Sequence, residues 1–398
     1  MDDDFLSALR TYIDDTKGNN SIEEPSCSNN TLVNLTVINC SDDLFALFEN
    51  FTAKDAKRIR SVGQVFFTYI TPVVFIMGLV GNILSLMVFL TKNMRRLSAS
   101  LYLAAISSAD LMALVFYVLI EWLRRGLSTS NGNGYVTVPF LERDGVCHVI
   151  LFLTYNFRFL SSWLVVCFTL ERYIGVCHPL KRRRNISDMS SSRKLIAIVI
   201  LISILVSLFR PWLNKEHHIG PNEVPWCIRR NEYQLVSFVY DCVFGISITF
   251  LPFLIITCLN ALIIRKLIMR NKFHRRSRII SEESIIRLEF TLILIAVSFC
   301  FVAFNTPYAV VWLTHFINSS SGAITIADMI NETQHIFLFT KTIYFMNYSV
   351  NFFLYSITGA YFRKELKMLL TCRSKSSKQY YGCSVRTSSS IISKSGAP

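Results

Sequence analysis

Charged residues are scarce in this chain, and that scarcity argues against a soluble single domain. Only 17% of the 398 residues are charged, whereas 52% are hydrophobic, and the mean hydropathy is +0.40. An ordinary soluble domain carries more charge and less apolar surface. The basic residues behind the net charge of +14 lie in short clusters between long apolar runs. This layout indicates contact with a membrane surface and no nucleic-acid partner.

Three kinds of motif are also missing. The eleven cysteines show no paired C-x-x-C spacing, so the sequence predicts no zinc site. Residues 1–10 are acidic and lack the basic and apolar regions of a cleavable signal peptide, so the first membrane span is expected to direct insertion. We find no H-E-x-x-H motif, nucleotide loop or nucleophile–base pair, and therefore expect no enzyme and no catalytic cofactor.

Seven apolar stretches are each long enough to cross a bilayer, which takes about 20 helical residues. Backbone groups in lipid must be satisfied within each segment, so the expected fold is an all-α bundle of seven transmembrane helices over residues 62–359. The seven stretches are residues 62–90, 98–123, 146–176, 195–212, 235–267, 285–316 and 334–358.

Lysine and arginine in the short loops predict the orientation. They cluster at residues 92–96, 181–194 and 265–278, which are alternate loops. Positively charged loops face the cytoplasm, so the amino terminus is expected outside and the carboxyl tail inside. We therefore expect a multi-pass protein of the plasma membrane.

Asn-x-Ser/Thr sequons in the leading segment agree with this orientation. Five of them lie within residues 1–61, the density of a glycosylated extracellular tail. Their asparagines are Asn19, Asn29, Asn34, Asn39 and Asn50. In the same tail, Cys27 and Cys40 either pair with each other or remain separate.

Glu171-Arg172-Tyr173 lies where the third apolar stretch meets a basic loop. Cys147 lies 25 residues before Arg172, at the outer end of that stretch. An acid–arginine pair alone is an ordinary interface anchor, but this spacing, with Asp110 in the second stretch, resembles the rhodopsin-like (class A) G-protein-coupled receptors. The resemblance covers roughly residues 62–370 and implies a ligand site facing outward and a heterotrimeric G-protein site facing the cytoplasm.

The resemblance also implies roles for particular residues. Cys147 would form a disulfide with Cys227 in the second extracellular loop. Residues 360–371 resemble a short amphipathic eighth helix on the lipid surface, and Cys372 behind it is a candidate palmitoylation site or a plain cysteine. The implied activation and G-protein residues are Glu171, Arg172, Tyr173, Pro179, Leu180, Asn351 and Tyr355.

The remaining tail, residues 372–398, is rich in serine. Phosphorylation by a receptor kinase would prepare it for arrestin, and a merely disordered tail is the simpler alternative.

Asp110 is a carboxylate in the middle of a membrane span, which is costly unless it has partners. Ser161, Asn347 and Asn351 are the expected partners. In the family these positions form a polar core that binds a structural sodium ion. A protonated Asp110 held by the same hydrogen bonds is the alternative.

Several positions depart from the family pattern. Phe352 follows Asn351 where the family has a proline, so the bend of the seventh helix must arise elsewhere. Asn305 stands where many relatives have a tryptophan. Arg287 replaces an acid that often pairs with Arg172, so we expect Arg172 to rest on Glu171 alone.

Two ligand classes are disfavoured by single residues. Thr154 occupies the position where amine receptors place an aspartate, and Phe345 the position where opsins place the retinal lysine. The outer halves of the helices instead carry charges of both signs among aromatic residues, which suggests a polar, extended ligand. The candidate ligand residues are Glu121, Thr154, Tyr155, Arg158, Asp241, Trp312, His315, Lys341 and Tyr344.

Arg158 lies too deep to reach water readily, so it either forms an internal salt bridge with Glu121 or Asp241 or contacts the ligand. We interpret three other outer arginines as anchors at the membrane interface, with ligand contact as the alternative: Arg124, Arg125 and Arg210.

A peptide ligand fits these groups best. Asn305, with Asn260 in the fifth stretch, resembles invertebrate neuropeptide receptors of the FMRFamide and myosuppressin type. If the peptide ends in Arg-Phe-amide, Glu121 or Asp241 would pair with its arginine. A lipid or small-molecule ligand is the alternative within this fold. A seven-span transporter is the alternative from another class, although no inverted repeat is visible.

Overall fold

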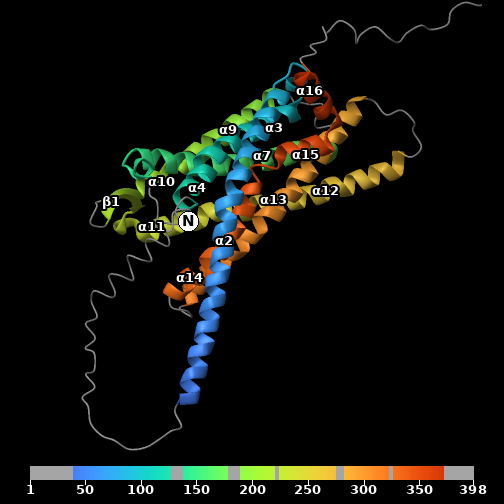
Figure 1. Cartoon of the computed structure of the whole chain (residues 1–398). Helices are drawn as coiled ribbons and strands as arrows, with labels where there is room; N and C mark the ends of the chain where they lie inside the picture. The colour runs from blue at the N-terminus through green and yellow to red at the C-terminus, as the bar shows by residue number, and fades with distance from the viewer. Residues whose placement is uncertain are drawn as a thin grey trace, which may run out of the picture.

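The computed structural model describes residues 39–126, 138–177, 189–219, 224–274, 282–321 and 326–371. Within these ranges no side chain is described for residues 39–61, 218–219, 224, 226, 231, 234, 270–274, 282–285, 287 and 315–335. The described chain is a bundle of long helices with one β-hairpin (Figure 1). Strand β1 and helices α10 and α11 lie at one end of the bundle, here called the hairpin end. Helix α16 lies at the opposite end, here called the α16 end.

In the part of the chain that the structure describes, six helical segments are long and apolar enough to cross a membrane. Two of them contain a π-helical turn, at Leu114–Leu119 and Ile246–Phe250, which shifts the helical register without ending the segment. The segments comprise α2 (Asn39–Phe89), α3 (Ser98–Ala113) with α4 (Ile120–Arg125), α7 (Val146–Cys177), α9 (Met189–Ser207) with α10 (Phe209–Trp212), α11 (Gln234–Gly245) with α12 (Leu251–His274), and α13 (Glu282–Ser321).

The seventh crossing is built from α14 (Ile326–Met346) and α15 (Asn351–Thr358). Between them the backbone N–H groups of Asn347, Tyr348 and Ser349 each donate to the carbonyl three residues earlier, at 3.1, 3.1 and 2.9 Å. This tighter turn breaks the helix where the family has a proline-induced bend. The bend therefore arises one turn before Phe352.

Helix α2 stabilises this break. The side-chain amide of Asn82 donates to the carbonyl of Tyr348 at 2.7 Å, and the Ser349 hydroxyl donates to the carbonyl of Val74 at 2.9 Å. Gly78 makes the close approach possible, because a Cβ there would lie 2.6 Å from the Ser349 hydroxyl oxygen. Carbonyls released by a broken helix must find such partners in an apolar surrounding.

Helix α16 (Ala360–Leu370) follows directly and packs back on the bundle. Phe362 is buried, with its ring 5.3 Å from that of Phe89 and 5.7 Å from that of Tyr355. At the start of α16, Glu289 of α13 accepts a hydrogen bond from the backbone N–H of Tyr361 at 2.5 Å. A carboxylate at a helix amino terminus satisfies a free N–H group and complements the helix dipole.

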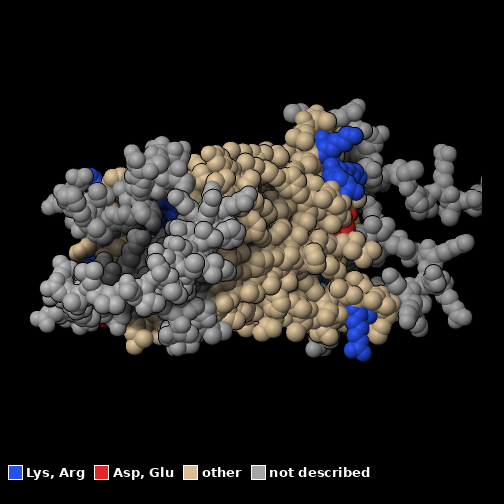
Figure 2. All heavy atoms as spheres, turned by 60° about the horizontal axis from the view of Figure 1, so that its bottom comes forward, with Lys and Arg blue, Asp and Glu red and all other residues tan. Residues whose placement is uncertain are grey.

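The outside of the bundle is apolar between its two ends. Large hydrophobic side chains such as Ile76, Leu205 and Leu254 are more than half exposed. Figure 2 shows a broad belt without charged side chains, with lysine and arginine at the ends. An apolar belt of this extent is unfavourable in water and suits lipid. The protein is a multi-pass membrane protein.

Several predicted residues lie outside this description. Helix α2 begins at Asn39, inside the segment expected to form the outer tail, but no side chain before residue 62 is described. The glycosylation sites therefore stay predictions. The side chains of Pro179, Leu180, Arg287, His315 and Cys372 also lie outside the described residues.

Candidate functional site

A disulfide ties the β-hairpin to the bundle. Strands β1 (Asn214–Ile219) and β2 (Val224–Arg229) pair antiparallel. Cys227 of β2 is bonded to Cys147 at the start of α7, with their Cα atoms 6.3 Å apart. The backbone N–H of Cys227 also donates to Glu142 at 3.1 Å. The bond holds β2 over the hairpin end of the bundle, as the resemblance implied.

Arg229 at the end of β2 reaches a buried ion cluster. Its Nη2 lies 2.7 Å from Oδ2 of Asp241 in α11, and Nη1 of Arg210 in α10 lies 3.6 Å from the same oxygen. The Tyr155 hydroxyl donates to Oδ1 of Asp241 at 2.8 Å. Asp241 is 1% exposed and Arg210 is 0% exposed. The interpretation of Arg210 as an interface anchor is therefore wrong, because its guanidinium points inward to a carboxylate.

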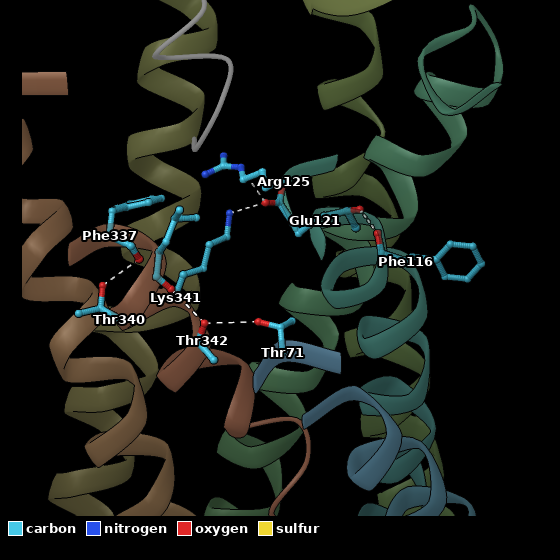
Figure 3. Close-up of polar contacts among 10 residues, drawn as sticks. Thr71, Phe116, Glu121, Arg125, Phe337, Thr340, Lys341 and Thr342 are labelled. Carbon is cyan, nitrogen blue, oxygen red and sulfur yellow. Dashed lines mark hydrogen bonds and ion pairs between the residues drawn. The ribbon is translucent and has the colours of Figure 1, made fainter. Parts of the chain in front are cut away.

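A second buried cluster joins α4 to α14 (Figure 3). Nζ of Lys341, which is fully buried, lies 2.6 Å from Oε2 of Glu121. Nε of Arg125 lies 3.4 Å from the same oxygen. Arg125 is 7% exposed, so it too is an internal partner and not an interface anchor. Arg124, more exposed, pairs with Glu142 at 2.8 Å and so also binds within the protein.

Arg158 lies between these two clusters. Its guanidinium carbon is 4.3 Å from the centroid of the Tyr117 ring, 5.9 Å from that of Tyr155 and 5.7 Å from that of Phe244. Aromatic faces attract a guanidinium through their quadrupole. Arg158 is 7% exposed and lines a cavity. Its contact with a ligand stays a prediction.

The cavity has a volume of about 30 Å³, enough for one or two waters. Four of the predicted ligand residues line it: Tyr155, Arg158, Asp241 and Trp312. Sequence reasoning missed others, including Phe244 and Tyr308. Phe244 lies three residues after Asp241, so the helical period was a usable signal for it.

The other predicted ligand residues whose side chains the structure describes lie elsewhere. Thr154 donates to the carbonyl of Phe116 at 2.7 Å, which satisfies its hydroxyl within the bundle. The hydroxyls of Tyr344 and Tyr348 are 2.7 Å apart, and the Tyr344 ring stacks on Tyr308 at 5.1 Å. Tyr344 thus lies behind the cavity wall, whereas Glu121 and Lys341 form their own cluster.

Asp110 lies deeper in the bundle, at 1% exposure. Oδ1 accepts from the Ser161 hydroxyl at 2.5 Å and Oδ2 from the Asn351 amide at 2.6 Å. Asn347 is connected to this group through its backbone carbonyl, which accepts from the Asn351 amide at 3.5 Å. Three helices far apart in sequence therefore meet at one carboxylate.

At the α16 end, Arg172 is 4% exposed and contacts the Glu171 carboxylate through Nε. The Ser98 hydroxyl donates to the other oxygen of Glu171 at 2.8 Å. The Arg172 guanidinium carbon lies 5.7 Å from the Phe168 ring centroid and 5.8 Å from that of Phe290 in α13. An aromatic contact to α13 thus occupies the region where relatives often have an ion pair.

Tyr355, an implied activation residue, and Asn305, a departure from the family pattern, both lie in the packed core. Tyr355 is fully buried, with its ring 5.2 Å from that of Phe89. Asn305 is 3% exposed and donates to the carbonyl of Phe301 in its own helix at 2.6 Å. Tyr173 is half-buried beside Arg172.

A known family model, described as 7 transmembrane receptor (rhodopsin family), matches residues 81–355 of this chain. The chain belongs to this family.

Similar receptors occur in nematodes and vertebrates. A probable G-protein coupled receptor of Caenorhabditis elegans, AH9.1, is 23% identical over 395 residues, covering 90% of this chain and 89% of that protein. The thyrotropin-releasing hormone receptor of Gallus gallus is 25% identical over 345 residues, covering 80% and 82%. A neuromedin U receptor homolog of C. elegans, nmur-2, is 26% identical over 178 residues, covering 40% and 42%.

Proposed function

We propose that this receptor binds an extracellular neuropeptide at the hairpin end and passes the signal to a heterotrimeric G protein at the α16 end. The observation that carries the proposal is the arrangement of buried charges around an aromatic cavity beneath a disulfide-tethered hairpin. A peptide offers both charged and apolar groups to such a surface. The names of two relatives, a thyrotropin-releasing hormone receptor and a neuromedin U receptor homolog, point the same way.

The proposed orientation places the hairpin end outside the cell and the protein in the plasma membrane. The amino terminus would then carry the glycans, and the tail after α16 would meet receptor kinase and arrestin. The basic loops predicted to face the cytoplasm support this orientation.

Signalling in this proposal is a shift between two arrangements of the bundle. An agonist that binds the active arrangement more tightly increases its population. A G protein engaging the region of Arg172 favours the same arrangement, so each partner raises the affinity for the other. The Phe290 contact is the element that links Arg172 to α13 in the structure described here.

Asp110 and Ser161 fit the sodium ion expected from the family. Their carboxylate and hydroxyl oxygens are hard ligands on adjacent helices, closed off from solvent. The ion would supply a positive charge that offsets the cost of burying an ionised Asp110. A protonated carboxyl held by Ser161 and Asn351 is the competing state.

A peptide of the FMRFamide type remains a specific hypothesis. Its arginine would have to compete for Glu121 with Lys341 and Arg125, or for Asp241 with Arg229. Replacing Glu121 or Asp241 by lysine should then reduce the potency of an Arg-Phe-amide peptide by tenfold or more. Equal potency in both variants would remove this hypothesis.

The test of the proposed function is a second-messenger assay. Cells expressing the receptor are screened with a neuropeptide library, and calcium and cyclic AMP are measured. We expect a saturable response that is lost in Arg172→Ala and kept in Arg193→Ala, a matched control that changes an exposed arginine on α9. Silence to every peptide despite surface expression would favour a lipid or small-molecule ligand.

A further inference from the structure

Helix α13 contacts two other elements through adjacent residues at the α16 end. Phe290 is 3% exposed, and its ring centroid lies 5.8 Å from the guanidinium carbon of Arg172 in α7. Glu289 is half-buried and accepts a hydrogen bond from the backbone N–H of Tyr361 in α16 at 2.5 Å. Successive side chains of a helix point about 100° apart, so this part of α13 is held from two sides.

The junction between α15 and α16 is shaped to receive the Glu289 carboxylate. Gly359 lies at this junction, and a Cβ there would be only 3.2 Å from Oε1 of Glu289. Nη1 of Arg363 donates to the carbonyls of Ser356 and Ile357 at 3.0 and 2.8 Å. An N–H group at the start of α16 and two carbonyls at the end of α15 therefore each have a side-chain partner.

Helix α16 is also attached to the bundle by contacts that do not involve α13. Glu365 is 4% exposed and accepts from the Thr91 hydroxyl at 3.3 Å and from the Asn93 amide at 3.0 Å, just after α2. The ring of Phe362 packs on that of Phe89 in α2. Because these contacts do not depend on α13, the hydrogen bond between the two helices restrains α13 as well as the first turn of α16.

The side chain of Arg172 is covered in this arrangement. It is 4% exposed and contacts the Glu171 carboxylate and the rings of Phe168 and Phe290. A protein partner can bind a guanidinium only where it is accessible. Glu171 and Phe168 belong to α7 itself, whereas Phe290 belongs to α13, so a shift of α13 away from α7 would expose Arg172. The same shift would pull Glu289 away from α16.

We propose that Glu289 is a positioning residue that holds α13 over Arg172 through its hydrogen bond to α16, and that this bond limits signalling in the absence of ligand. The inference rests on the proposed G-protein site and adds its regulation. Relatives often have an acid at the position of Arg287 that pairs with Arg172. In this chain the acid that restrains α13 lies two positions later and binds the backbone of α16.

The strength of this hydrogen bond sets the size of the effect. Exposing Arg172 requires the loss of the bond, so its free energy counts against the exposed arrangement. Removing a cap of this kind should therefore raise the ratio of the exposed to the covered arrangement about fivefold.

The first measurement is a pair of distances in the full-length receptor purified in detergent. Spin labels are carried by unnatural amino acids, so the native cysteines stay in place. One pair of labels joins Leu292 of α13 to Lys367 of α16, and the reference pair joins Arg96 of η1 (Met94–Arg96) to Lys367. All three side chains are exposed, so the labels should not disturb the packing.

The α13–α16 pair should respond to the loss of the carboxylate. Glu289→Ala should add a longer distance, with the ratio of the longer to the shorter population about fivefold above that of the unmodified receptor. Glu289→Gln should have a smaller effect, because its amide carbonyl still accepts the N–H bond but without the charge. The reference distance should stay unchanged in both variants.

Glu216→Ala is the matched control. Glu216 also accepts a backbone hydrogen bond, from the N–H of Asp144 at 2.6 Å, but it lies at the hairpin end. Its replacement removes a carboxylate of the same kind and should leave both distances unchanged.

The second measurement is calcium and cyclic AMP in cells without added ligand, at matched surface expression. Glu289→Ala should raise the basal output by up to about fivefold, in proportion to the exposed arrangement. Combining it with Arg172→Ala should abolish the rise, and Glu216→Ala should keep the basal output of the unmodified receptor.

An unchanged α13–α16 distance in Glu289→Ala would overturn the inference. A longer reference distance would overturn it as well, because it would show that α16 leaves the bundle. A response to a peptide together with unchanged basal output in Glu289→Ala would remove the inference and leave the proposed function standing. A longer α13–α16 distance without any second-messenger response, with or without peptide, would support the restraint on α13 and remove the proposed function.

Discussion

Removing one charge at a time from the buried cluster of Glu121, Lys341 and Arg125 should give unequal losses of stability. Glu121→Gln leaves the fully buried Lys341 and the nearly buried Arg125 without their shared carboxylate. Breaking a buried pair from one side costs about 3–5 kcal/mol, because the remaining charge stays uncompensated. Lys341→Met leaves Glu121 with Arg125 at 3.4 Å, so we expect only about 1–2 kcal/mol.

The double variant tests the same reasoning. Glu121→Gln combined with Lys341→Met removes both members of the 2.6 Å pair. Replacing a buried ion pair by uncharged side chains is often neutral or stabilising. The double variant should therefore be more stable than Glu121→Gln alone, and the coupling energy should be at least about 1 kcal/mol.

The assay is the apparent unfolding midpoint of the purified receptor at one fixed heating rate. Glu121→Gln should lower it by on the order of 10 °C and Lys341→Met by about 3 °C. Asp144→Asn is the control, because this acid pairs with His148 while 67% exposed, and exposed pairs contribute little. A larger loss in Lys341→Met than in Glu121→Gln, or a double variant less stable than either, would refute the reasoning.

Three further outcomes can be measured on the same material. Cys147→Ser and Cys227→Ser should each reduce the free energy of unfolding by up to about 4 kcal/mol, because the disulfide closes a loop of 80 residues. Each variant should therefore lower the midpoint and surface expression, and the double variant should lose no more than either single one. Asp110→Asn should remove any rise of the midpoint when sodium chloride replaces choline chloride, whereas no sodium effect in the unmodified receptor would indicate a protonated Asp110. Glu289→Ala should cost about 1 kcal/mol through the lost cap on the α16 N–H of Tyr361, and unchanged proteolysis of the segment after Thr358 would show that the cap does not hold α16.

Much of the fold followed from the sequence because a bilayer imposes a length and a polarity on every span. The seven apolar stretches predicted the helices, and the six segments that meet the length requirement lie within a few residues of the expected positions. The fixed rise of a helix also made spacing informative. Cys147, 25 residues before Arg172, comes at the opposite end of α7, next to Cys227.

The bend of the seventh helix shows that the local sequence pattern is not sufficient to predict where a helix breaks. The missing proline at Phe352 correctly indicated that the bend had another cause. It did not indicate the break at residues 347–350, because that break depends on Asn82 and Ser349 bonding across to other backbone groups. Such bonds join residues more than 260 positions apart in the chain.

The sequence by itself determined the number of spans, their depth and which residues are charged within them. Only the tertiary structure decided which charges meet. The sequence suggested that Arg210 and Arg125 are interface anchors, but both side chains point into the bundle. The sequence pattern did not identify Arg229 as a buried residue, because it lies in a strand between two spans. Hydropathy reports how deep a side chain lies. The partner of a buried charge depends on the rotation of each helix, on register shifts such as the π-turn at Ile246–Phe250, and on where the disulfide places the hairpin.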